Sequence, residues 1–167
     1  MTLAEFNQLQ AGKKSEALQR CCGSTSWIGK MLASGPFKDL AELLDAAEEN
    51  WYACSEQAWL EAFQHHPKIG DINSLREKYA NTAAWASNEQ SGVNAASDKI
   101  LEDLSAGNDD YEKKFGYIFI VCATGKSAAE MLEMLNSRLG NDPEEEIKIA
   151  AGEQNKITKI RLEKLFV

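Results

Sequence analysis

One apolar run limits the folds that this chain can adopt. Residues 117–123 are its most apolar stretch, and their composition suits either a buried strand or a buried helix end. The rest of the sequence offers no second strand candidate with which this run could pair. We therefore predict a helix end that leads into a buried extended segment. The fold class that follows is all-α, with one compact multi-helix domain spanning residues 1–167.

Helical signals account for most of the remaining sequence. Thr2 and Glu5 have the spacing of a capping box, Ser55 is a candidate N-cap, and Pro143 suits a first helical position ahead of three glutamates. We expect Gly107 and the two residues after it to end the long polar helix. The predicted helices cover about 15–22, 26–33, 38–54, 55–66, 74–79, 87–106, 127–139 and 143–165.

Composition argues against several classes of partner. Hydrophobic residues make up 44% and charged residues 26%, as in an ordinary globular protein, and the net charge is −8. Such a charge disfavours binding to nucleic acid or to an anionic membrane. No apolar run approaches the length of a membrane span, and the first residues lack a secretory pattern. The four cysteines show no CxxC spacing, so we expect reduced thiols and a cytoplasmic protein.

Both histidines lie side by side at a predicted helix end. Pro67 disfavours helical backbone at His66, and Gly70 allows a further turn soon afterwards. An imidazole at such a rigid corner could serve as a catalytic group, although a plain helix end has the same pattern. A metal site is less expected, because adjacent side chains point in different directions and the chain has no further histidine.

Two other stretches could supply partners for this imidazole. Arg161 falls on an apolar stripe of the final helix, where it would either form a buried salt bridge or offer its planar fork to a ligand. Glu89 and Gln90 could be a capping device behind Ser87. If Glu89 points inward instead, the chain has a carboxylate, an imidazole and a guanidinium for acid–base work on a small polar molecule.

Four motifs, in a fixed order and at similar spacing, together resemble a known family over nearly the whole chain. They are Phe63…His66-Pro67-x-Ile69-Gly70, Glu89-Gln90-x-Gly92, Tyr111…Phe115-Gly116-Tyr117-x-Phe119-Ile120-Val121 and Glu153…Ile157…Arg161-Leu162. This set resembles the OHCU decarboxylase family, which acts on 2-oxo-4-hydroxy-4-carboxy-5-ureidoimidazoline, the last unstable intermediate of urate breakdown. The resemblance implies an all-helical decarboxylase that needs no cofactor, yields (S)-allantoin and is usually a homodimer.

The resemblance also implies roles for particular residues. His66, Glu89 and Arg161 match the family's catalytic positions, and no metal ligand is implied. The implied substrate-binding positions are Pro67, Ala86, Ser87, Gln90, Tyr117, Ile118, Phe119, Ile120 and Val121. One departure is that Ala86 stands where the family usually has serine, with Ser87 next to it.

Two other functions stay open from the sequence. A non-catalytic helical ligand-binding or scaffold module could retain this fold, and the missing serine at Ala86 is the best argument for it. A metal-dependent hydrolase built on His65 and His66 is the weaker alternative.

Overall fold

The computed structural model describes residues 1–68, 73, 75 and 91–166, and every regular element in this part of the chain is an α-helix. The predicted all-α class is confirmed for these residues. The helices are α1 (Leu3–Gln8), α2 (Ala11–Gln19), α3 (Thr25–Ser34), α4 (Leu40–Tyr52), α5 (Glu56–Gln64), α7 (Ser91–Phe115), α8 (Ala128–Leu139) and α9 (Pro143–Leu165).

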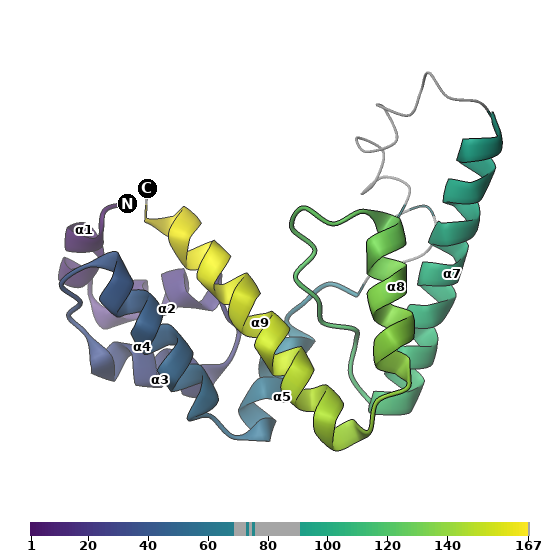
Figure 1. Ribbon diagram of the computed structural model, residues 1–167. Coiled ribbons are helices and arrows are strands. Elements are labelled where there is room, and N and C mark those ends of the chain that lie inside the picture. Colours follow the sequence, from purple (N-terminus) through teal and green to yellow (C-terminus); the bar gives the residue numbers. More distant parts are fainter. Residues whose placement is uncertain (69–72, 74, 76–90, 167) are drawn as a thin grey trace. The chain divides into compact units, whose positions relative to one another are not determined.

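The described residues form two compact units, and the first contains both ends of the described chain. It comprises Met1–His66, Ile120–Cys122 and Ile147–Val167. In it α3 packs against α2, α4 and α5. The ring of Phe6 in α1 meets that of Phe166 edge-on, with centroids 5.3 Å apart, so the N-terminal helix lies beside the end of α9 (Figure 1).

Buried tryptophans join the helices of this first unit. Trp27 donates from Nε1 to the carbonyl oxygen of Ala47 at 3.0 Å. Trp51 donates in the same way to the carbonyl oxygen of Ala151 at 2.8 Å, which ties α4 to α9. Both indoles are at most 1% exposed, so each bond satisfies a donor that water cannot reach.

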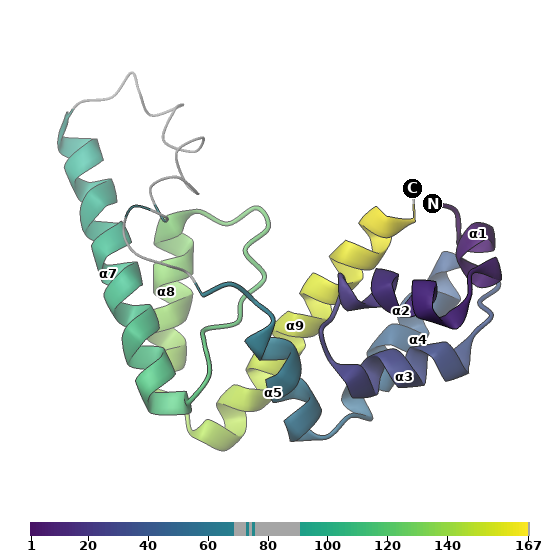
Figure 2. The same ribbon diagram turned by 180° about the vertical axis from the view of Figure 1, so that it is seen from behind.

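The second unit is built on two long helices. It comprises Pro67–Phe119 and Ala123–Glu146, and α7 and α8 lie side by side in both views (Figures 1 and 2). Gly107 permits their close approach, because a Cβ there would lie 2.5 Å from Cδ2 of Leu135. The predicted helix break at this glycine is therefore wrong: α7 continues to Phe115, since packing against α8 outweighs the weak helix propensity of the segment.

The apolar run behaves as the sequence indicated. After α7 ends, Gly116 adopts a positive φ of 82°, and residues 118–123 are irregular, with no helix. Four side chains of the run are at most 8% exposed: Phe119, Ile120, Val121 and Cys122. The part of this prediction that places a buried, non-helical segment after a helix end is thus confirmed.

Local cap chemistry sets most of the helix ends. Thr2 and Ser127 form complete capping boxes, and Ser55 caps α5 through a bond to the amide of Ala58. Helix α2 begins earlier than expected, at Ala11, where Gln10 makes no side-chain cap. The predicted helix at 74–79 and the start of the one at 87 lie outside the described residues. Within the described chain, no helix has the length and apolar character needed to span a bilayer.

Candidate active site

His66 lies at a corner that its neighbours hold in place. Helix α5 ends at Gln64, and the amide of His66 donates to the carbonyl oxygen of Phe63 at 3.2 Å. The phenyl ring of Phe63 is fully buried, which anchors the end of the helix. The His65 ring is exposed and packs on Gly23, where an added Cβ would come within 2.5 Å of that ring. The helix end expected at His66 is therefore held in place within the first unit.

The imidazole of His66 makes one hydrogen bond to α9. Its Nε2 is paired with Oε1 of Gln154, a side chain that is fully buried. Burial lowers the pKa of His66; the bond to Gln154 acts in the opposite direction, and the nearby Arg161 and His65 lower the pKa further. The neutral imidazole is therefore the favoured form near neutral pH.

Arg161 lies near His66 but not where the apolar stripe placed it. The residue is exposed, its Nη1 is 3.5 Å from the carbonyl oxygen of Cys21, and the buried position is its neighbour Leu162. The alternative of a buried salt bridge is thus wrong, because an exposed guanidinium is solvated. Its charge nevertheless acts on the imidazole of His66, so the first unit brings two of the three predicted catalytic residues together.

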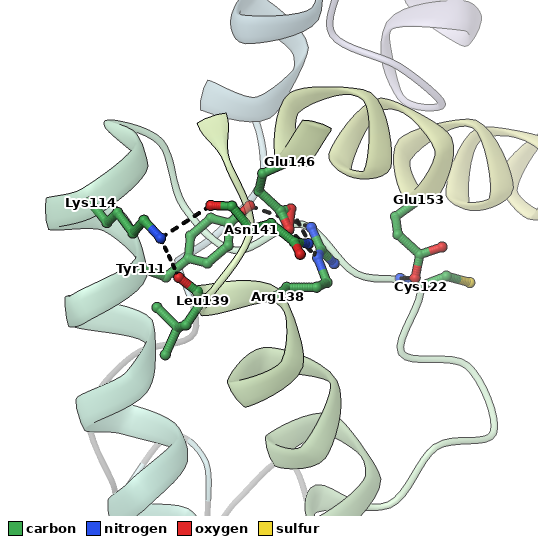
Figure 3. Close-up of polar contacts among 8 residues, drawn as sticks. All are labelled: Tyr111, Lys114, Cys122, Arg138, Leu139, Asn141, Glu146 and Glu153. Carbon is green, nitrogen blue, oxygen red and sulfur yellow. Dashed lines mark hydrogen bonds and ion pairs between the residues drawn. The ribbon is translucent and has the colours of Figure 1, made fainter. Parts of the chain in front are cut away.

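The buried extended segment is held from α9 as well. The amide of Cys122 donates to Oε1 of Glu153 at 3.4 Å (Figure 3). Glu153 is 4% exposed, and its other oxygen pairs with Nζ of Lys156 at 2.6 Å. This contact fixes the end of the run that contains Ile120 and Val121, which belong to the first unit. Pro67, Tyr117, Ile118 and Phe119 belong to the second unit.

A buried ion pair in the second unit escaped the sequence analysis. Arg138 Nε lies 2.7 Å from Oε1 of Glu146, and its Nη2 is 3.4 Å from the hydroxyl of Tyr111 (Figure 3). The guanidinium carbon also stacks 4.5 Å from the ring centroid of Phe119. One sign of it was available in the sequence: Arg138 lies three residues after Leu135 and on the same, buried face of α8.

Two further polar residues on the buried face of α9 were also missed. Gln154 and Thr158 are at most 4% exposed and lie one helical turn apart. They share this face with Ala150 and Ala151. Buried polar side chains need hydrogen-bond partners, so their spacing could have indicated a polar group packed against this face of α9.

Several predicted site residues cannot be placed. Ala86, Ser87, Glu89 and Gln90 lie outside the described residues, so the orientation of Glu89 stays a prediction. In the part of the chain that the structure does describe, no cluster of three or more His, Cys, Asp or Glu side chains could hold a metal ion.

Comparison with known proteins assigns the chain to a class. The family model described as OHCU decarboxylase matches residues 7–163, and the chain therefore belongs to the OHCU decarboxylase family. It is 40% identical, over 149 residues, to the uric acid degradation bifunctional protein TTL of Arabidopsis thaliana, covering 87% of this chain and 45% of that protein. The chain thus spans less than half the length of this relative.

Two other similar proteins match over more than nine tenths of their length, and a third over about half. A 2-oxo-4-hydroxy-4-carboxy-5-ureidoimidazoline decarboxylase of Halalkalicoccus jeotgali is 25% identical, with 100% of this chain and 93% of that protein covered. A crystal structure of OHCU decarboxylase in the presence of (S)-allantoin matches with a TM-score of 0.69 and 39% identity, covering 89% of this chain and 95% of that one. An (S)-allantoin synthase structure shares the fold, with a TM-score of 0.72 at 16% identity over 99% of this chain and 54% of the other.

Proposed function

We propose that this chain decarboxylates 2-oxo-4-hydroxy-4-carboxy-5-ureidoimidazoline (OHCU) to (S)-allantoin, as the last step of urate degradation to allantoin. The activity is that of a carboxy-lyase, a carbon–carbon lyase. One observation supports it above the others: a neutral, half-buried imidazole at His66 lies within reach of the positive charge of Arg161. The family match, which includes both residues, supports it as well.

The chemistry of the substrate suits this pair. Breaking the bond to the carboxylate releases CO₂, and its electron pair enters the adjoining imine and carbonyl system of the ring. No separate electron sink is needed, so we propose that no cofactor takes part. The ring carbon then takes up a proton on one face while the former ring hydroxyl gives up its proton and becomes a carbonyl. The enzyme must stabilise the negative charge and select that face.

Three residues carry the proposed catalytic roles. His66, as a neutral imidazole, accepts a proton from the substrate and returns it on one face. Glu89 supplies the catalytic carboxylate. Arg161 offers two parallel N–H donors to the carboxylate or to the ring carbonyls. The proposed substrate contacts are Pro67, Ala86 or Ser87, Gln90, Tyr117, Ile118, Phe119, Ile120 and Val121.

We further propose that residues 1–167 act as one domain, form a homodimer and work in the cytoplasm. The family match supports the first point, since it runs across both compact units without interruption. Sedimentation of the purified chain at several concentrations would test the dimer.

The proposed reaction can be followed directly. OHCU is generated from urate with the enzymes of the two preceding steps, and its ultraviolet absorbance is recorded after the chain is added. We expect the decay to accelerate in proportion to the concentration of the chain. A decay no faster than the spontaneous one would favour a non-catalytic binding module, for which the alanine at position 86 is the best argument.

A further inference from the structure

A chain of hydrogen bonds leads from the interior of the first unit to His66. Gln154 accepts through Oε1 at the imidazole, and its Nε2 donates to Oγ1 of Thr158 at 3.0 Å. All members except His66 are buried, so water does not compete for these bonds.

The two ends of the Gln154 amide set the direction of these bonds. Its nitrogen, Nε2, donates to the hydroxyl oxygen of Thr158, and its carbonyl oxygen, Oε1, faces the imidazole. A carbonyl oxygen can only accept, so Nε2 of His66 must carry the proton.

We propose that Gln154 is a positioning residue that locks the neutral His66 as its Nε2–H tautomer and leaves Nδ1 as the proton-accepting nitrogen. The expected effect of Gln154 on turnover rests on the proposed function, whereas the expected tautomer of His66 does not. Gln154 acts through His66, because its own amide is committed to Thr158 and to the imidazole.

The surrounding charges are compatible with this lock. Among the described residues, the charged groups that act on the imidazole are Arg161 on α9 and His65 at the same corner, and both favour the neutral ring. The buried partner of the ring, Gln154, is a neutral amide, which can hold a neutral imidazole without drawing a second proton onto it.

The tautomer can be measured without any substrate. The chain has 2 histidines, so ¹⁵N-labelled protein gives few imidazole signals, and a His65→Gln variant assigns them. We expect a slowly exchanging imidazole N–H signal from Nε2 of His66 and a non-protonated Nδ1. In Gln154→Met, which keeps the length of the side chain but removes the acceptor, this signal should be lost. Thr158→Val should weaken the Nε2–H signal, and this variant provides the test if Gln154→Met does not fold.

A pH profile separates positioning from a structural role. Gln154→Glu places a carboxylate against Nε2, which should raise the pKa of the imidazole. The acidic limb of the plot of kcat/KM against pH should then shift to higher pH by about one unit. Gln57→Glu, the same change at an exposed site on α5, should leave the limb in place. A merely structural role would lower the rate at every pH without moving the limb.

Two results would overturn the inference. One is a protonated Nδ1 in the unaltered protein, and the other is an Nε2–H signal that persists unchanged in both Gln154→Met and Thr158→Val. If the chain proves inactive on OHCU, the proposed function fails, while the tautomer measurement still decides the role of Gln154.

Discussion

Arg138 and Glu146 form an ion pair from which water is almost fully excluded, with 7% and 0% of their side-chain surfaces exposed and Nε lying 2.7 Å from Oε1. The guanidinium also lies over the ring of Phe119 and contacts the hydroxyl of Tyr111. It therefore joins the end of α8, the end of α7 and the start of the buried extended segment within one unit.

Removing one partner of this pair should be costly. Glu146→Ala removes the carboxylate that pairs with a buried guanidinium, and we expect the free energy of unfolding to fall by about 3–5 kcal/mol. Urea denaturation measures this change. Glu144→Ala, an exposed residue in the same first turn of α9, should cost no more than about 1 kcal/mol. Equal losses in the two variants would mean that the buried pair contributes nothing.

Two helical glycines should respond in opposite directions to alanine. A methyl group at Gly107 would meet Leu135 at 2.5 Å, so overpacking should cost about 1–3 kcal/mol and outweigh the gain in helix propensity. At Gly152 the nearest atom is the Tyr52 hydroxyl at 3.8 Å, and alanine should stabilise α9 by up to about 1 kcal/mol. Thermal denaturation of the two variants compares them. A stabilised Gly107→Ala variant would contradict the close packing of α7 on α8.

Arg161→Lys should weaken substrate binding more than it slows the chemical step. The lysine keeps the charge but loses the planar fork, and a lost charged hydrogen bond of about 1.5–3 kcal/mol corresponds to a rise in KM of roughly tenfold or more. Steady-state kinetics gives both parameters. Arg20→Lys, at an exposed helix end, provides the control. An unchanged KM would count against the proposed role of Arg161.

His66 should make stability depend on pH. Its pKa is lowered in the folded protein, chiefly by burial. As the pH falls through about 6.5, the unfolded chain binds a proton before the folded one does, so this contribution to stability is present above pH 6.5 and is lost on acidification. Denaturation at pH 7.5 and 5.5 should therefore show a smaller loss for His66→Gln than for the unaltered protein. His65→Gln should retain the larger loss, and identical slopes in all three would refute the assignment.

Features that depend on interactions between residues close together in the sequence could be predicted from the sequence. The caps at Thr2, Ser55 and Ser127 and the start of α9 at Pro143 each depend on residues a few positions apart. The burial of residues 119–122 was predictable from the apolar composition of the run. By contrast, the break expected at Gly107 failed because Leu135, a residue of another helix, packs against that glycine.

The candidate site was predictable only in part, for a similar reason. His66 could be found from its place before Pro67, but its partner Gln154 comes from a helix far along the chain. Arg161 was assigned to the buried stripe although Leu162 occupies that face, because Gln154 also belongs to the stripe and its polar side chain interrupts the apolar pattern. Glu89 lies outside the described residues, and its role stays a prediction.

The central claim is most directly tested by the handedness of the product. OHCU is generated from urate in the cuvette, and the circular dichroism of the allantoin is recorded with the unaltered chain, with His66→Ala and without either. We expect a single-enantiomer (S)-allantoin signal to grow rapidly with the unaltered chain and to be absent with the folded His66→Ala variant. A racemic product with the unaltered chain, or an undiminished signal with His66→Ala, would contradict the account.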